Sequence, residues 1–511
     1  MTVALPREAA TPRSSRQHVA LIACVLLATL MVAFNQTILT TALPTMAGEL
    51  DAASSLGWVM SAFTLTSTMS VPLYGSLSDV VGRRGLFLGA ITTFTLASVA
   101  AALSTDLGTL VASRMVQGVG GGGLLVLSHA VLADAVPVRD RPRYAGVLGT
   151  VWAVACVAGP LLGAWFTSGP GWAWSFWVNV PLGLAALGLA VVAVPASRDA
   201  ARATLDLAGI TTLCLATGAV TLLVAWAGTR YPWWSVPTAA LALTTVVAAA
   251  LLVASERRAR HPVLPPDVVG ERNFVLATGA GLLVGGVAMF SVITYLPVYL
   301  QMVRGLGQLA AGLAVTPMIV AIIVVATLTG FRASRTGRYV AVTTSGCVLS
   351  ALALGLLSTL DEDSSVVVIC GYAGAFGVGL GMTTQLLLTV VQNSLPQAQV
   401  GAATAANTYF RQVGATVGIA GLGSLLTARV AERLAAGLPV DADRLTPARL
   451  QSLPEETRAA VVTAYADALP PLFGLLAVLA LVSGVLLVFL RNVRLGDQPT
   501  LPDLATPRGL D

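Results

Sequence analysis

The chain has 511 residues, of which 56% are hydrophobic and 10% charged, and its mean hydropathy is +0.82. A soluble domain is about 45–50% apolar and about 25% charged, so this composition excludes a soluble globular protein and predicts an integral membrane protein. The net charge of +5 gives no support for nucleic-acid binding.

Membrane spans are predicted from the apolar runs. A bilayer core about 30 Å thick needs about 20 mostly apolar residues per helix, because lipid cannot satisfy open backbone groups. The first run continues past the roughly 7–15 residues of a signal-peptide core, so we interpret it as a span rather than a cleaved leader. The fourteen runs cover approximately residues 17–44, 57–77, 86–104, 108–133, 144–167, 174–194, 205–228, 233–254, 273–302, 306–330, 339–358, 364–394, 401–428 and 468–490.

Arginine indicates the orientation, since the chain contains no lysine. With the N-terminus in the cytoplasm, 20 of the 29 arginines fall on cytoplasmic segments and 7 on outer segments. Most of the outer ones lie on the single long loop 429–467, and topology is set by short loops. We therefore predict a multi-pass protein of the cell membrane with both tails, 1–16 and 492–511, in the cytoplasm.

The reactive residue types indicate neither a metal nor a cofactor. The five cysteines all fall within apolar runs, where a small apolar residue is the expected role. The three histidines lack metal-ligand spacing, and no Walker sequence for ATP hydrolysis is present. We expect no metal, no cofactor and no enzymatic activity.

The second and third runs are joined by the sequence YGSLSDVVGRRG. Its glycines permit positive φ angles and close helix approach, and its aspartate is placed to pair with an arginine or a helix N-terminus. A solvated loop that merely obeys the positive-inside rule is the alternative. Its spacing of glycines recurs in GFRASRTGR, Gly330–Arg338, between the tenth and eleventh runs, and internal repeats of this kind build many transporters. The predicted conformational switch consists of Gly75, Asp79, Gly82, Arg83 and Arg84.

Two further motifs lie within spans. LVASRMVQGVGGG in the fourth run contains Arg114 and Gln117, and a guanidinium inside a membrane is costly enough to suggest a functional site, unless it snorkels to the outer interface. AGPLLG in the fifth run contains Gly159, Pro160 and Gly163, where the missing proline N–H weakens the helix and creates a pivot or a purely structural kink.

With these motifs, the sequence resembles the major facilitator superfamily, and within it the fourteen-helix drug:proton antiporter family. The resemblance covers nearly the whole chain. It implies an all-α integral membrane protein with two six-helix bundles, 17–195 and 272–491, and two inserted transmembrane helices, 204–255. It also implies that Arg114 and Gln117 belong to the RxxQG motif and that the glycines and proline of the fifth run form the antiporter motif.

Two departures from the family pattern stand out. Asn35 occupies a position where the family usually has an aspartate, and an amide cannot exchange a proton in the working pH range. Ala173 stands where an arginine is usual. The proton-carrying group is then open: His129 has an unperturbed pKa near 6.5, although a packed core histidine is the alternative. Arg411 in the thirteenth run faces either the bundle interior or an interface.

These observations predict a proton-driven exporter of drugs or natural products that works by alternating access. Alternatives are an uncoupled facilitator or importer of a small organic solute, and a non-transporting receptor or scaffold. The expected partners are protons, the lipid bilayer and an amphiphilic small molecule, neutral or anionic, since no carboxylate lies deep in the membrane. A monomer is expected. The predicted coupling and substrate cavity contains Asn35, Arg114, Gln117, His129 and Arg411.

Overall fold

The computed structural model describes most of the chain, and its description has gaps between the ranges that follow. The described residues are 15–49, 57–136, 141–194, 207–227, 231–259, 262–337, 339–396, 399–434, 450 and 454–491. Within these ranges the regular structure is helical, apart from an isolated bridge between Ala227 and Tyr231. Of the predicted terminal tails, 1–16 and 492–511, residues 1–14 and 492–511 lie outside the described residues.

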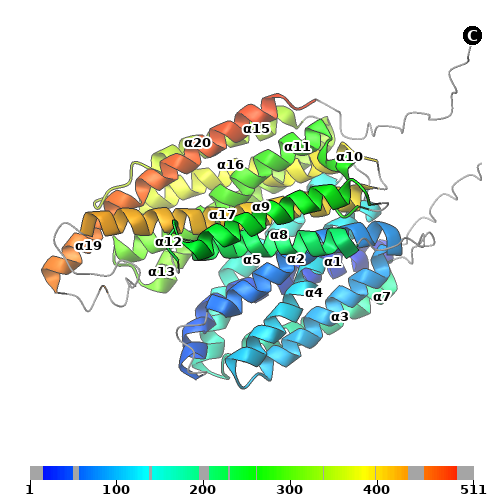
Figure 1. Cartoon of the computed structure of the whole chain (residues 1–511), viewed down its shortest axis with the longest axis horizontal. Helices are drawn as coiled ribbons and strands as arrows, with labels where there is room; N and C mark the ends of the chain where they lie inside the picture. Colours follow the sequence, from blue (N-terminus) through cyan, green and yellow to red (C-terminus); the bar gives the residue numbers. More distant parts are fainter. Residues whose placement is uncertain are drawn as a thin grey trace, which may run out of the picture.

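The N-terminal half is built from long helices joined by short turns (Figure 1). Asp106 caps the fourth helix by accepting a 2.9 Å hydrogen bond from the Thr109 backbone N–H, which satisfies one of the open donors of a helix start. The elements are α1 (Ser15–Glu49), α2 (Gly57–Val81), α3 (Arg83–Ala102), α4 (Leu107–Ala135), α5 (Arg141–Ser168), α6 (Trp174–Trp177) and α7 (Asn179–Ala193).

The inserted hairpin consists of α8 (Leu207–Trp226) and α9 (Val236–Glu256). In the C-terminal half, α11 passes through the π-helical segment η2 into α12, so one membrane-crossing stretch contains all three. The C-terminal elements are α10 (Pro266–Val269), α11 (Arg272–Ala280), η2 (Gly281–Ala288), α12 (Met289–Met302), α13 (Gln308–Leu313), α14 (Thr316–Thr336), α15 (Val340–Leu357), α16 (Val366–Asn393), α17 (Val400–Leu434), α19 (Glu455–Ala468) and α20 (Pro470–Val488).

Twelve stretches among the described residues are long and apolar enough to cross a membrane. Two of the fourteen predicted runs do not reach that measure. α2 is rich in serine and threonine, whose hydroxyls bond to the preceding turn, as in the 2.9 Å bond from Thr66 to the Ala62 carbonyl. α8 contributes only the shorter apolar helix Ala208–Val224. An all-helical membrane protein is therefore confirmed, and the count of fourteen spans stays a prediction.

The two halves have separate apolar cores and meet along two seams. One core runs from Leu21 on α1 to Val194 after α7, and the other fills the C-terminal half. Across the seams, α2 packs against α17 and α5 packs against α14. Val71 of α2 and Val126 of α4 belong to the C-terminal core, so the seam is closely packed there.

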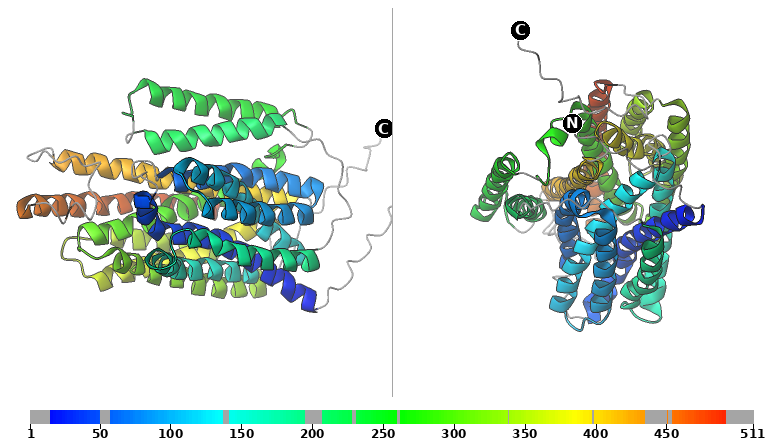
Figure 2. Two further views of the ribbon diagram at one scale, coloured as in Figure 1. Left: turned by 90° about the horizontal axis from the view of Figure 1, so that it is seen from below. Right: turned by 90° about the vertical axis from the view of Figure 1, so that its right-hand side faces the viewer.

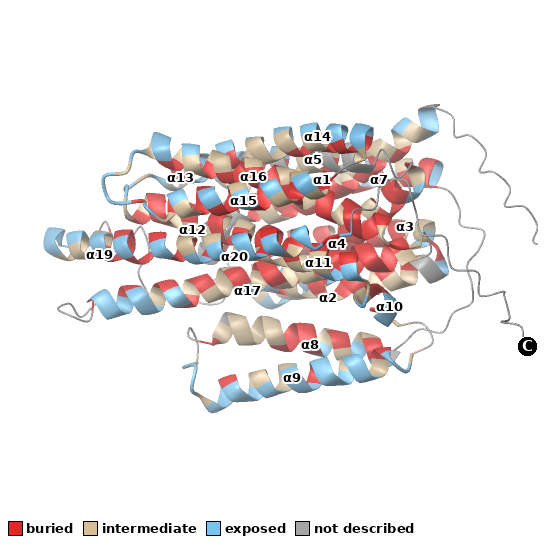
Figure 3. Ribbon diagram, turned by 90° about the horizontal axis from the view of Figure 1, so that it is seen from above, coloured by how far each residue is buried: buried red, intermediate tan, exposed pale blue. Residues whose placement is uncertain are grey.

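The α8–α9 hairpin stands to one side of the two halves (Figure 2). α8 packs on both α2 and α17, whereas α9 packs on α8 and otherwise presents an exposed apolar surface (Figure 3). In a bilayer such a surface faces lipid, because lipid tails are as apolar as the side chains themselves.

Candidate functional site

Arg114 of α4 lies at the centre of a polar cluster inside the N-terminal half. Its side chain has 0% exposure, so the guanidinium does not snorkel to the outer interface. Nη1 donates a hydrogen bond to Asn35 Oδ1 of α1 and a 2.6 Å bond to Gln117 Oε1, and Nε donates a 3.0 Å bond to the Val59 carbonyl. Gln117 in turn donates a 2.7 Å bond to Ser98 of α3. The cluster therefore ties α1, α2, α3 and α4 together.

Neutral groups hold this guanidinium. The Arg114 Cζ atom lies 4.4 Å from the centroid of the Phe63 ring, which adds a cation–π contact. Arg114 Nη2 and Asn35 Nδ2 have no hydrogen-bond partner among the described residues. Since an unpaired buried cation is costly, the Asn35 oxygen partly replaces a counter-ion, and no carboxylate whose side chain the structure describes bonds Arg114.

The turn between α2 and α3 is a single residue, Gly82, with a φ of 96°. A residue with a Cβ is strained in that conformation, so glycine is required there. In the repeat of this motif, Gly337 caps α14 with a φ of 68°. The predicted tight connection is thus present in both halves.

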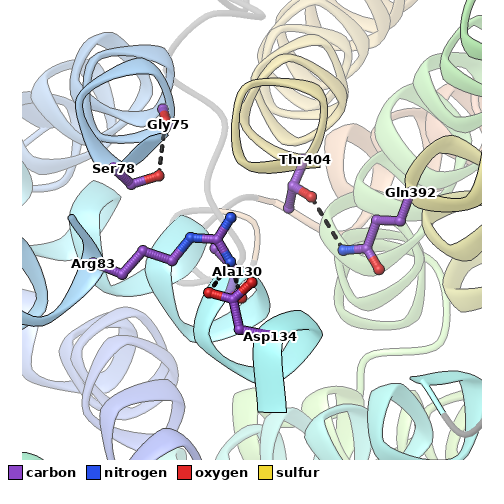
Figure 4. Close-up of polar contacts among 7 residues, drawn as sticks. All are labelled: Gly75, Ser78, Arg83, Ala130, Asp134, Gln392 and Thr404. Carbon is purple, nitrogen blue, oxygen red and sulfur yellow. Dashed lines mark hydrogen bonds and ion pairs between the residues drawn. The ribbon is translucent and has the colours of Figure 1, made fainter. Parts of the chain in front are cut away.

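Arg83, the first residue of α3, bridges to the end of α4 (Figure 4). Its guanidinium lies 2.5 Å from an Asp134 carboxylate oxygen and donates a 2.6 Å bond to the Ala130 carbonyl. Arg84 donates a 2.7 Å bond to the Val191 carbonyl near the end of α7. The side chain of Asp79 lies outside the described residues, so its predicted pairing stays a prediction.

Gly75 lies on the seam between the halves. A Cβ atom added to Gly75 would lie 2.1 Å from Ala405 Cβ and 3.2 Å from the Gly401 carbonyl oxygen, both on α17. No real contact is that short, so only glycine permits α2 and α17 to approach this closely. Figure 4 shows Gly75 on α2 beside the α17 turn that carries Thr404.

Gly159, Pro160 and Gly163 lie within one continuous helix, α5. A Cβ on Gly159 would lie 2.1 Å from Thr37 Oγ1, so Gly159 permits α5 to pack tightly on α1. Pro160 lies in the helix interior, where its ring nitrogen cannot donate a backbone hydrogen bond, and Gly163 is buried. α5 contacts α1 in its own half and α14 in the other half, which is the position of a pivot.

Arg411 of α17 and His129 of α4 come from opposite halves, and these two helices pack against each other. Both side chains are half-buried. His129 Nδ1 lies 2.9 Å from the Leu125 carbonyl oxygen one turn back on α4. Arg411 lies beside η2, since a Cβ on Gly285 would be 3.5 Å from Arg411 Cδ. This places Arg411 inside the bundle, one of the two predicted alternatives.

The predicted site residues thus form four groups: the Arg114 cluster with Asn35 and Gln117, the α2–α3 turn, the glycines and proline of α5, and the seam with Gly75, Arg411 and His129. The sequence reasoning missed Asp134 as the partner of Arg83. An acidic residue at the end of one span and an arginine at the start of a neighbouring span were the available signal. The sequence carried no comparable signal for the η2 segment or for Ala405.

Comparisons with known proteins agree with this architecture. Residues 25–419 match the Major Facilitator Superfamily. An uncharacterized MFS-type transporter of Mycobacterium tuberculosis is 37% identical, covering 92% of this chain and 69% of that protein. The multidrug transporter protein MdtP of Bacillus subtilis is 29% identical over 85% of this chain and 79% of that protein. The efflux pump FUS6 of Gibberella moniliformis is 31% identical over 81% and 75%.

Solved structures show the same fold at low identity. The human organic anion transporter MFSD10 superposes with a TM-score of 0.63 and 15% identity, covering 92% of this chain and 99% of that one. The proton:xylose symporter XylE gives a TM-score of 0.63 and 14% identity over 95% and 98%. With a matched family over most of its length and this helical architecture, the chain belongs to the Major Facilitator Superfamily, whose members are membrane transporters and not enzymes.

Proposed function

We propose that the protein exports amphiphilic drugs or natural products from the cell by proton antiport. Relatives that share 29–31% identity are named a multidrug transporter and efflux pumps, and this supports export over import. The motif of Gly159, Pro160 and Gly163 resembles that of antiporters and occupies the helix that contacts both halves.

Alternating access between the half 17–195 and the half 272–491 is the proposed mechanism, with the hairpin 204–255 beside them. The observation that carries it is Gly75, where the seam between α2 and α17 leaves no room for a Cβ atom. A contact this close exists only in a conformation in which the halves meet at this level, so it distinguishes one state from the other. Only such differential contacts shift a conformational equilibrium. The proposed switch is the turn of Asp79, Gly82, Arg83 and Arg84, which follows Gly75 in the chain.

Coupling to protons is the part of this proposal that Asn35 complicates. Because Asn35 cannot titrate, another group must carry the proton if antiport operates, and His129 is the proposed carrier. The second candidate function, an uncoupled facilitator, is favoured by the same observation, since the Arg114 cluster holds a fixed charge without a described carboxylate.

The topology completes the proposal. We propose fourteen spans, with α2 and α8 also crossing the membrane, both termini in the cytoplasm, location in the cell membrane and a monomeric state. α2 has 25 residues and α8 has 20, which at about 1.5 Å per residue gives each helix roughly the length of the bilayer core.

The proposed substrates are neutral or anionic. An ion in a low-dielectric cavity is strongly disfavoured without an opposite charge, and a permanent cation would need a carboxylate at depth. The two charges that the described spans hold away from their ends are Arg114 and Arg411, both positive.

Everted vesicles from a host without its own exporters provide the test. Uptake of a drug into the vesicles is measured with and without an imposed pH gradient, and vesicles without the protein are the control. Uptake that requires the gradient and collapses when an ionophore dissipates it is expected. Uptake that only equalises concentrations, with or without the gradient, would establish the uncoupled facilitator instead.

A further inference from the structure

Arg411 differs from the other arginine inside the membrane. The Arg114 guanidinium is fully buried and bonded to its neighbours. Arg411 is half-buried, and the described residues give it no hydrogen bond or ion pair. A guanidinium carries five N–H donors, so a half-buried one with none of them used is poised for a ligand.

The surroundings of Arg411 fix where its guanidinium extends. The Cγ and Cδ atoms lie against the glycine face of η2, 4.0 and 3.5 Å from an ideal Cβ position on Gly285. The same position lies 3.4 Å from Thr384 Cγ2 of α16, so the aliphatic part of the side chain is held in the C-terminal half. α17 also packs against α4, the helix that carries His129, so Arg411 lies on a helix that borders the other half, close enough for its charge to act on His129. π-helical turns such as η2 frequently occur at functional sites.

His129 supplies the complementary hydrogen-bonding group. A carbonyl oxygen only accepts, so in the 2.9 Å contact with the Leu125 carbonyl the hydrogen is on Nδ1. In the neutral ring, Nε2 is then an acceptor. Arg411 therefore offers donors and His129 offers an acceptor, one from each half.

We propose that Arg411 and His129 form the subsite for an acidic aromatic group of the substrate. A carboxylate or phenolate oxygen accepts hydrogen bonds from Arg411, and a neighbouring hydroxyl donates to His129 Nε2. This inference rests on the proposed transport function and adds the recognition chemistry to it. Because the two residues belong to different halves, a substrate held by both favours the conformation in which the halves meet.

Other charged groups on the adjoining elements are already engaged. Arg114 bonds Asn35 and Gln117, and Arg83 pairs with Asp134 at the end of α4. None of the carboxylates whose side chains the structure describes bonds Arg411. An anion at this position thus meets an uncompensated cation, and desolvated charge-assisted bonds are the strong ones.

The test uses two dyes that share a xanthene core and differ in charge: fluorescein, an anion with a carboxylate and phenolic oxygens, and rhodamine 123, a cation. Fluorescence polarisation on the purified full-length protein gives the Kd of each dye. We expect R411Q to weaken fluorescein binding by about tenfold to a hundredfold, the range for losing charge-assisted bonds. H129Q should weaken it less, and neither variant should weaken rhodamine 123.

Matched variants separate this role from a structural one. R411K keeps the charge and should retain most of the affinity for fluorescein, whereas R411E should reverse the preference between the dyes. Arg304 lies after α12 and bonds the Glu362 carbonyl, so R304Q removes one positive charge away from the seam and should leave both Kd values unchanged. Elution as a single folded species in size-exclusion chromatography is required of every variant.

Two results would overturn the proposal: a fluorescein Kd within twofold of the wild type in R411Q, or an equal loss for both dyes. Cellular export separates it from the proposed function. If cells export rhodamine 123 but fluorescein binding does not depend on Arg411, the protein is an exporter and the proposed subsite is wrong. If fluorescein binding depends on Arg411 but cells export neither dye, the subsite is supported and the proposed export function is wrong.

Discussion

Arg114 of α4 and Asn35 of α1 are joined by a hydrogen bond between the guanidinium and the side-chain amide, and both residues are buried. Arg114 Nη2 and Asn35 Nδ2 have no hydrogen-bond partner among the described residues. A carboxylate would offer a second acceptor oxygen in place of Nδ2, so the amide replaces a carboxylate only in part. The pair joins the two helices, and among the described side chains no carboxylate bonds Arg114.

The first prediction concerns Asn35. N35D supplies the missing negative charge to Arg114, so it should fold, insert in the membrane and melt at a higher temperature than the wild type. N35L removes one acceptor of a charge-assisted hydrogen bond while Gln117 and the Val59 carbonyl still bond Arg114, and it should cost about 1.5–3 kcal/mol. Melting temperatures of the purified proteins provide the comparison. Loss of folded protein in N35D would contradict the account.

The second prediction concerns the seam at Gly75. G75A places a methyl group where Ala405 Cβ already lies, 2.1 Å away, so it should prevent α2 and α17 from closing and reduce export. A405G makes room for that methyl group. The double variant G75A/A405G should therefore transport better than G75A alone at equal expression. A double variant as inactive as G75A would mean that the seam is not what the methyl group disturbs.

The third prediction concerns Arg83 and Asp134. Their ion pair is partly exposed, with 12% and 41% of the side chains accessible, so we expect D134N to lose only about 1 kcal/mol of stability. Export should fall much further if the turn acts as a switch. R83K keeps the charge, and because a single nitrogen, Nη1, contacts both Asp134 and the Ala130 carbonyl, it should retain more export than D134N. Export at the wild-type rate in D134N would exclude this pair from the switch.

Sequence patterns predicted the fold because the bilayer imposes a length and a composition on each span. They also predicted a tight turn with a positive φ at a glycine, and the structure has a positive φ at Gly82. The motif around Arg114 predicted a buried cation, and Arg114 is buried with Gln117 beside it.

The sequence patterns did not predict which residues of distant segments pair with each other. Arg83 and Asp134 are 51 positions apart, and nothing local to either residue names the other. The contact of Gly75 with Ala405 depends on how the halves close, which side-chain periodicity does not encode. At α2, threonine hydroxyls bonded to their own helix lower the hydropathy without exposing open polar groups, so the span predicted there stays a prediction.

The fourth prediction is a pH dependence at Asp106, the N-cap of α4. Hydrogen bonds from Thr109 hold the pKa of this carboxyl below its ordinary value of 3.8. A depressed folded-state pKa contributes stability above the unfolded-state value, and that contribution is lost as the pH falls through the folded-state pKa. D106N keeps a capping oxygen that does not titrate. The melting temperature of the wild type should therefore fall relative to that of D106N as the pH falls below about 4, and the difference between the two should stay constant above about 5. If this difference does not change across the pH range, the charge of the Asp106 carboxylate does not contribute to the cap of α4.

The last prediction concerns how the inserted hairpin is attached. Thr217 of α8 and Tyr409 of α17 are buried, and their hydroxyl oxygens lie 3.0 Å apart. Thr217 donates to the Leu213 carbonyl at 2.7 Å, so Tyr409 is the donor in the contact between helices. On its other side, α8 packs against α2, where Met69 lies close to Gly218. The Thr217–Tyr409 pair is therefore a polar attachment of α8 to the C-terminal half.

The two single variants should differ because only one leaves a buried donor without an acceptor. Y409F removes the donor while Thr217 still bonds Leu213, and we expect a loss of about 0.5–1.5 kcal/mol. T217V strands the Tyr409 hydroxyl and should cost about 1–3 kcal/mol, whereas the double variant, with both groups apolar, should resemble Y409F. Thermal melting of the three proteins measures the order, and T244V on the exposed face of α9 is the matched control. If Y409F melts below T217V, this hydroxyl pair does not attach the hairpin to α17.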